Sequence, residues 1–331
     1  MIESKPASIL DSAFFRILIL LVVLAYFALG FYWLSVTYRW SLHMIVDLPL
    51  YQKLIKETWW LVTYYSSELG LSVGIVLRFI AGIFALYSAV IFLKGGESSL
   101  PKIRSKVGAA IFFEGLYFLT YAPSAILGFV YPIAERQNLW YFEPRAPWLI
   151  VFLVAGLACL AMVVVIAPSL FKLRAKIVHN APNQEVIKWS CITGVSYIFI
   201  MFWLNYTLTW AATLVYWPER AQPGIEILYN PLAITSFLVT SIGLLLIAAS
   251  SLKVTMPAIK GKPKEVNLQK LGYVILAFGL YFIIMLIIYA VAGGYYAQPT
   301  TWMEIIGPHN PDLWCAFLIL PGIYLAAKSR R

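Results

Sequence analysis

Long apolar runs alternate with short polar segments along the whole chain. Eight runs can be marked, at about 13–37, 61–93, 107–131, 148–170, 187–216, 232–254, 271–295 and 313–327. Most of them have the roughly 20 residues that a transmembrane helix needs. The runs at 61–93 and 187–216 are long enough to tilt or project beyond the bilayer, and the last is short and interrupted by Pro321 and Gly322. The pattern predicts an all-α integral membrane protein with about eight transmembrane helices.

The polar segments after the even-numbered runs carry a recurring basic motif. It reads SLPKIRSK at 99–106, SLFKLRAK at 169–176 and TMPAIKGK at 255–262, with a weaker version, YLAAKSRR, at 324–331. Lys and Arg at a helix exit anchor the membrane interface and suit a helix C-terminus. Because proline interrupts a helix, Pro101 and Pro257 are expected to end the helices that precede them.

The segment that follows the motif repeats as well. KVGAAIFFEGLYF at 106–118 aligns without gaps with KLGYVILAFGLYF at 270–282. Self-similarity of this kind predicts repeated structural units, here four parallel helical hairpins in one domain, 1–331. The hairpins are expected at about 61–131, 148–216 and 232–295, and 313–327 plus 13–37 completes the fourth.

Each odd-numbered run carries a tyrosine at a comparable depth. The four are Tyr26, Tyr117, Tyr197 and Tyr281. One interpretation is that they surround a central cavity. The other, favoured for aromatic residues at equivalent places, is that they pack between hairpins.

Composition and charge strengthen the membrane prediction and give it a direction. The chain is 61% apolar and only 12% charged, whereas a soluble domain has about 25% charged residues. Eighteen of the 25 Lys and Arg residues fall in the N-terminus, the C-terminus and the loops 94–106, 171–188 and 253–270. This distribution predicts that both termini are cytoplasmic in a multi-pass protein of the cell membrane, with its basic face against anionic lipids. The net charge of +10 therefore needs no nucleic acid as a partner.

The first apolar run is expected to be retained as a membrane span. It is too long for the apolar region of a signal peptide, and no small-residue cleavage site follows it. The cysteines, Cys159, Cys191 and Cys315, are odd in number and lie in or beside apolar runs, which argues against a disulfide framework.

The sequence predicts no metal or cofactor. None of the three histidines, His43, His179 and His309, lies in an apolar run, so a bis-histidine haem between spans is not favoured. They are also too scattered for a zinc site. Hydrolase and nucleotide-binding motifs are absent, so catalysis is not favoured, although outer carboxylates such as Asp312 leave it open.

Polar residues inside the apolar runs are the main candidates for chemistry. Arg78 lies in the middle of its run, where it costs about 2.5–3.5 kcal/mol and normally has a partner. Glu114 on the next run is the expected partner, but the predicted spans place it roughly 10 Å away in depth at 1.5 Å per residue. A direct pair then needs tilt or long reach, or else a water or hydroxyl in between. A structural ion pair is favoured over a gate or proton site, and Asn205 is expected to bond between helices rather than to a ligand.

The predicted outer loops are rich in Trp, Tyr and Pro and carry little charge. Such residues are typical of an interfacial aromatic belt, but short apolar loops also suit a docking surface for a protein partner. The candidates for docking are Trp140, Glu226, Glu304 and His309.

Two functional classes follow from these patterns. The first is a non-catalytic membrane subunit that anchors or scaffolds a partner at the outer face, for instance a redox subunit of an electron transport complex. The second is a channel or transporter for a small or hydrophobic solute, which would use Arg78, Glu114 and Asn205. An enzyme acting on a lipid or quinone is a third and weaker hypothesis.

Overall fold

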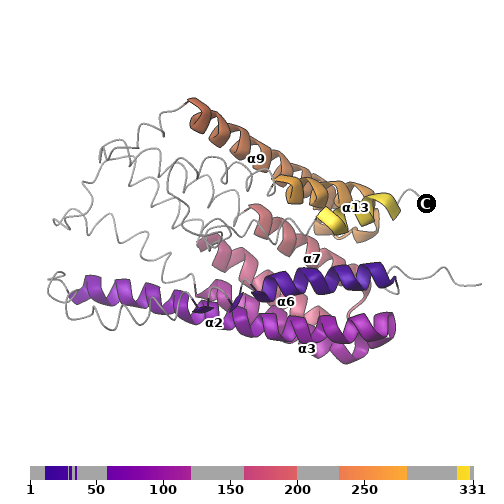
Figure 1. Cartoon of the computed structure of the whole chain (residues 1–331), viewed down its shortest axis with the longest axis horizontal. Helices are drawn as coiled ribbons and strands as arrows, with labels where there is room; N and C mark the ends of the chain where they lie inside the picture. Colours follow the sequence, from indigo (N-terminus) through magenta and orange to yellow (C-terminus); the bar gives the residue numbers. More distant parts are fainter. Residues whose placement is uncertain are drawn as a thin grey trace, which may run out of the picture.

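The structure of the protein is a computed structural model, and it describes residues 12–28, 30–31, 34–35, 58–120, 160–199, 231–281 and 319–328. Within these ranges the backbone forms helices and turns and contains no strand, which confirms the all-α class. A described helix falls in each of the eight apolar runs (Figure 1).

The described helices have the following bounds. They are α2 (Thr58–Gly95), η2 (Gly96–Ser99), α3 (Leu100–Leu119), η3 (Met162–Ile166, a π-helical turn), α6 (Ala167–Val178), α7 (Asn183–Tyr197), α9 (Pro231–Ile259), η7 (Pro263–Glu265) and α13 (Ile319–Lys328). Two further helices carry no label in Figure 1: the N-terminal helix (Ala13–Ala28) and the seventh-run helix (Leu268–Tyr281).

Helices that follow one another in the chain pack side by side. α2 packs on α3, α3 on α6, α6 on α7, and α7 on α9. Figure 1 shows this order, from α2 and α3 at one edge through α6 and α7 to α9 at the other. Because η2 and the turn 179–182 are short, the helices that they join run antiparallel, as in an αα-hairpin.

The seventh-run helix packs between α9 and α13 and contacts both. A Cβ on Gly243 of α9 would lie 3.8 Å from the ring of Tyr281. A Cβ on Gly272 would lie 2.6 Å from the backbone nitrogen of Ala326 in α13, and one on Gly322 would lie 2.5 Å from the backbone nitrogen of Leu276. Only glycine fits such a crossing, so the two backbones are in direct contact.

The N-terminal helix closes the circle between α13 and α2. The ring of Phe15 stacks on Tyr324 of α13, with centroids 5.4 Å apart. On its other side, Phe27 lies against Phe79 of α2 at the same centroid distance. Nη1 of Arg16 donates to the carbonyl oxygen of Leu93 near the end of α2, at 3.0 Å. The described helices therefore form a closed circle in chain order.

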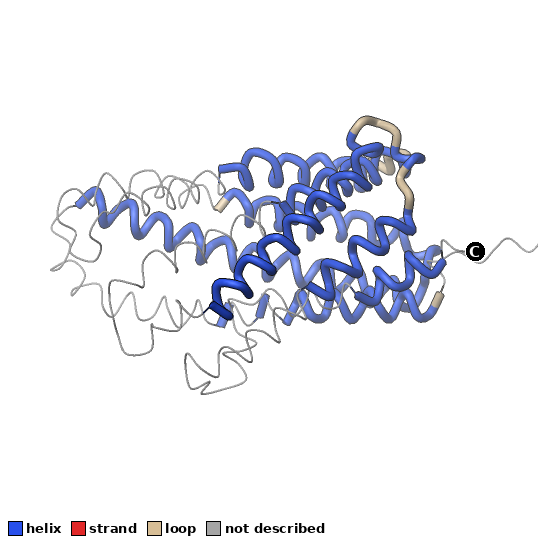
Figure 2. The backbone as a smooth tube through the Cα atoms, turned by 90° about the horizontal axis from the view of Figure 1, so that it is seen from above, coloured by secondary structure: helices blue, strands red, loops and turns tan. Residues whose placement is uncertain are grey.

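The turns between the paired helices gather at one end of the bundle (Figure 2). The basic motifs lie at this end. The prediction that the segments 94–106, 171–188 and 253–270 are loops is wrong, because they are mostly helix. Lys and Arg are good helix formers, so the helices continue past the apolar runs.

The two motif prolines do not end the preceding helices as predicted. Pro101 lies in the first turn of α3, a position where the missing N–H of proline costs nothing. Pro257 lies inside α9, which ends at Ile259. The cations of the first motif therefore begin a helix, where they oppose the helix dipole. Those of the other motifs lie at or just after helix ends, including Lys328 at the end of α13.

The first residue of each of the first three motifs donates its hydroxyl to a backbone oxygen three or four positions earlier. The buried hydroxyl of Ser99 donates to Gly96 O at 2.7 Å, that of Ser169 to Val165 O at 2.6 Å, and that of Thr255 to a carbonyl one helical turn earlier at 2.8 Å. A buried hydroxyl needs such a partner, and the preceding turn supplies it in all three places.

Two helical stretches among the described residues are long and apolar enough to cross a membrane, namely Ser72–Leu119, which includes η2, and Ile242–Ile259. In each, only 28% of the most apolar window is buried. A core helix of a soluble protein with this composition would be mostly buried. Large side chains such as those of Val164 and Leu246 are instead exposed, which supports association with a membrane.

Candidate functional site

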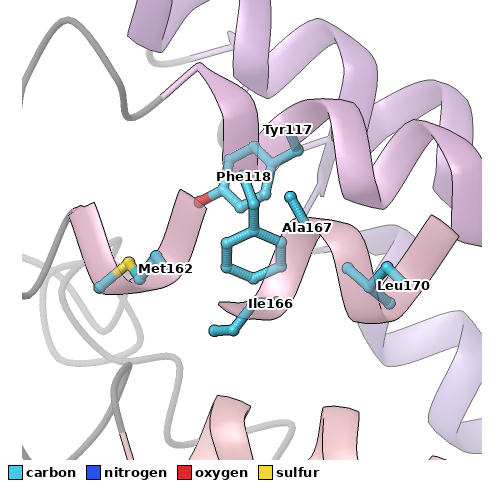
Figure 3. Packing of buried hydrophobic residues seen from close by; sticks show 6 residues of the cluster. All are labelled: Tyr117, Phe118, Met162, Ile166, Ala167 and Leu170. Atoms are coloured by element: carbon cyan, nitrogen blue, oxygen red, sulfur yellow. The ribbon is translucent and has the colours of Figure 1, made fainter. Parts of the chain in front are cut away.

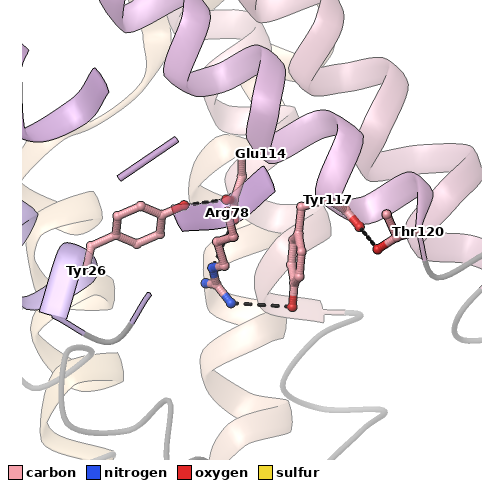
Figure 4. Close-up of polar contacts among 5 residues, drawn as sticks. All are labelled: Tyr26, Arg78, Glu114, Tyr117 and Thr120. Carbon is pink, nitrogen blue, oxygen red and sulfur yellow. Dashed lines mark hydrogen bonds and ion pairs between the residues drawn. The ribbon is translucent and has the colours of Figure 1, made fainter. Parts of the chain in front are cut away.

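The described part of the bundle contains one charged pair well away from the turns. Nε of Arg78 on α2 lies 3.7 Å from Oε1 of Glu114 on α3, and the two side chains are only 18% and 16% exposed. Figure 4 shows the pair among three other polar side chains. A charge taken out of water is stable only when it is paired and hydrogen-bonded, so the surroundings of this pair decide what it does.

The register of α2 and α3 explains why the pair is direct. Arg78 lies 17 residues before Gly95, the end of α2, and Glu114 lies 14 residues after Leu100, the start of α3. A difference of three residues corresponds to about 4.5 Å along the helices, well within the reach of the two side chains. The predicted separation of roughly 10 Å in depth is wrong, because it counted the first turns of α3 as loop.

Two tyrosine hydroxyls complete the bonding of the pair. Tyr26 of the N-terminal helix donates to Oε2 of Glu114, and Nη1 of Arg78 donates to the hydroxyl oxygen of Tyr117 at 3.4 Å. The guanidinium carbon lies 5.4 Å from the ring centroid of Tyr26 and 4.9 Å from that of Tyr117. The cation is thus held between two aromatic rings, an arrangement that favours it electrostatically.

Tyr197 of α7 reaches the same region, whereas Tyr281 does not. The ring of Tyr197 packs edge to face against Phe118, with centroids 5.8 Å apart, and so lies against the buried cluster that also contains Tyr117. Tyr281 is buried on the opposite side of the circle, beside Gly243. Three of the four repeated tyrosines therefore lie around one charged pair.

A hydrophobic cluster covers the pair on the α6 side. Its buried members are Tyr117, Phe118, Met162, Ile166, Ala167 and Leu170. In Figure 3 the ring of Phe118 points from α3 toward η3 and α6, and Phe118, Met162, Ile166 and Ala167 are fully buried. Tyr117 belongs both to this cluster and to the site, so Arg78 adjoins a buried apolar region on this side.

Gly74 and Thr120 contribute to the site although the sequence did not single them out. Gly74 lies one turn before Arg78, and a Cβ there would come within 3.2 Å of the ring of Tyr117. Thr120 donates to the backbone oxygen of Tyr117 at 2.6 Å and so closes the last turn of α3. The sequence could have indicated Gly74, because this residue lies four positions before Arg78 and therefore on the same helix face.

The geometry makes this site a clamp. It joins the N-terminal helix, α2 and α3 through polar contacts and reaches α7 through Tyr197. The guanidinium cannot release a proton, and the carboxylate already accepts a hydrogen bond from Tyr26 and is ion-paired with Arg78. Within the described residues no three His, Cys, Asp or Glu side chains are grouped to hold a metal ion.

The remaining predicted site residues lie outside the described residues. These are Asn205 and the outer docking candidates Trp140, Glu226, Glu304 and His309.

Comparison with known proteins adds no further assignment. No known family model, curated protein or solved structure matches this chain.

Proposed function

We propose that this chain crosses the cell membrane eight times, as four helical hairpins, with both termini and the basic motifs in the cytoplasm. The exposed apolar sides of the helices support a lipid environment. The gathering of the turns and basic motifs at one end of the bundle supports a single cytoplasmic face. Ser72–Leu119 turns back at η2, so it counts as two adjacent crossings, each of a length that suits the bilayer.

Within this arrangement the protein acts as a non-catalytic membrane subunit that holds a partner at the outer face. The observation that carries the proposal is the clamp around Arg78 and Glu114. Its charges are bonded to each other and to tyrosines of the same chain, so they serve to fix helices rather than to bind a solute. The aromatic, weakly charged outer loops then provide the surface for a partner.

Accessibility labelling tests the orientation. After replacement of the native cysteines, single variants Lys102→Cys, Lys172→Cys and Lys260→Cys are exposed to a membrane-impermeant maleimide. We expect labelling only after the cells are permeabilised, whereas Trp140→Cys on a predicted outer loop should react in intact cells. Labelling of the three lysine positions in intact cells would reverse the topology and remove the proposal.

Isolation in mild detergent tests the subunit role. The tagged protein should co-purify with a second polypeptide from its native membranes, and mass spectrometry identifies it. Trp140→Ala and His309→Ala should lower the recovery of this partner, whereas Lys260→Gln, at the opposite end, should not. Recovery of the chain as a lone and stable species contradicts the subunit role.

A channel or transporter is the second candidate, and one observation favours it. An ionisable pair inside a membrane bundle is by default a functional-site hypothesis. If Arg78 and Glu114 line a path for a solute, Arg78→Leu should abolish flux in a reconstituted system while expression is retained. Unchanged flux in that variant excludes a path through this pair.

A further inference from the structure

A second group of cations and an aromatic ring lies near the turn between α6 and α7. Nζ of Lys172 on α6 is 4.8 Å from the ring centroid of Trp189 on α7. Nζ of Lys188 is 5.9 Å from the same centroid. Both distances are within the range in which an ammonium is attracted to an indole. Two positive charges thus converge on one aromatic ring.

The neighbouring carboxylate is already paired. Glu185 lies one helical turn before Trp189, and its Oε2 is 3.5 Å from Nζ of Lys176, one turn after Lys172. Because α6 and α7 run antiparallel, the Lys176–Glu185 pair lies near the turn, and Lys172 and Lys188 lie farther from it along the two helices. Lys172 and Lys188 both lie within about 6 Å of the same ring centroid, so their positive charges add at this place and attract an anion.

The elements packed around this place leave the charge of the two lysines uncompensated. Arg174 on α6 lies 5.0 Å from the ring centroid of Phe112, on the α3 side of α6. On the side of η7, the carboxylate of Glu265 is 3.2 Å from Nζ of Lys262, so it is already paired with its own cation. The charge that can attract an anion here is therefore that of Lys172 and Lys188.

An apolar strip continues from Lys172 toward the middle of the bundle. Pro168, Val165 and Val164 lie four, seven and eight positions before it, the spacing of one helix face. All three are exposed, Val164 to 61%. A charged head above an apolar strip matches a molecule that is itself anionic at one end and apolar along its length.

We propose that Lys172, Lys188 and Trp189 bind the phosphate group of an anionic phospholipid. The two ammonium groups neutralise the phosphate, and the indole N–H of Trp189 supplies a further donor. An acyl chain lies along the strip formed by Pro168, Val165 and Val164. This inference rests on the proposed function, because it requires the basic motifs to lie at a lipid headgroup layer.

Native mass spectrometry of the purified protein tests the site. The whole chain in neutral detergent is titrated with phosphatidylglycerol, with phosphatidylcholine as the zwitterionic reference. The double variant Lys172→Gln/Lys188→Gln should bind phosphatidylglycerol roughly 30-fold more weakly, since each basic residue near an anionic surface contributes about 1 kcal/mol and 1.4 kcal/mol is tenfold. The matched control Lys260→Gln/Lys264→Gln removes the same charge from exposed positions after α9 and should retain the affinity within about twofold.

Three results overturn the inference. An equal loss in both double variants shows general attraction of a basic face. No loss in either variant shows that lipid binds elsewhere. Displacement of the lipid by an excess of inorganic phosphate assigns the two lysines to a soluble phosphate instead.

The topology experiment keeps this test separate from the proposed function. Labelling of Lys172→Cys in intact cells removes the proposed topology. Labelling only after permeabilisation, combined with no preference for phosphatidylglycerol, removes the lipid site alone.

Discussion

Removing either member of the Arg78–Glu114 pair should destabilise the bundle, whereas removing both together should cost less than the two single losses added. In Arg78→Leu, the carboxylate of Glu114 keeps its buried place and its bond to Tyr26 but loses the cation beside it. In Glu114→Leu, the guanidinium of Arg78 remains without its carboxylate. The double variant leaves neither charge without its partner.

The expected magnitudes follow from the burial of the pair. Removing one partner of a buried ion pair costs about 3–5 kcal/mol. The side chains of Arg78 and Glu114 are only 18% and 16% exposed, so this magnitude applies to them. Arg78→Leu and Glu114→Leu should therefore each cost about 3–5 kcal/mol. Replacing both charges of such a pair by apolar residues is often neutral or stabilising. The double variant should therefore recover at least about 2 kcal/mol relative to the sum of the two single losses.

A double-mutant cycle isolates the contribution of the pair. The loss in the double variant minus the sum of the two single losses is the coupling free energy, and it should be negative if the two charges stabilise each other.

Equilibrium unfolding in mixed micelles measures the two single variants and the double variant. The protein in dodecylmaltoside is titrated with dodecyl sulfate and followed by far-ultraviolet circular dichroism, with the unmutated protein as the reference. Single losses that simply add in the double variant would refute the reasoning, because Arg78 and Glu114 would then not be paired in the folded protein.

Three further variants test the packing, each by the same unfolding measurement. Tyr26→Phe removes a donor to a charged acceptor and should cost about 1.5–3 kcal/mol; no loss would show that the hydroxyl of Tyr26 does not bond Glu114. Gly272→Ala forces α13 away and should cost about 1–3 kcal/mol, whereas Gly194→Ala, where a Cβ meets nothing within 4 Å, should be neutral or stabilising; equal effects contradict the backbone contact. Met162→Ala empties a fully buried position and should cost about 2–5 kcal/mol, while Val164→Ala, which faces lipid in the proposed topology, should change little; a large loss there would contradict the lipid-facing assignment.

The sequence by itself determined the class of the protein and the places of its helices. Apolar runs of about 20 residues can satisfy their backbone in lipid only as helices, so their positions were readable without a structure. The pairing of Arg78 with Glu114 was readable for a similar reason, because a lone charge in such a run needs a partner. Membrane crossing by all eight runs stays a prediction.

Tertiary structure decided how the runs are joined and which side chains meet. The composition of the basic motifs suits a loop and a helix end equally, so the sequence could not show that α3 begins at Leu100. That start sets the register that brings Glu114 level with Arg78. The closed circle likewise depends on the contact between Gly272 and Gly322 and on the stacking of Phe15 on Tyr324. Such contacts join distant parts of the chain through shape, and no local pattern records them.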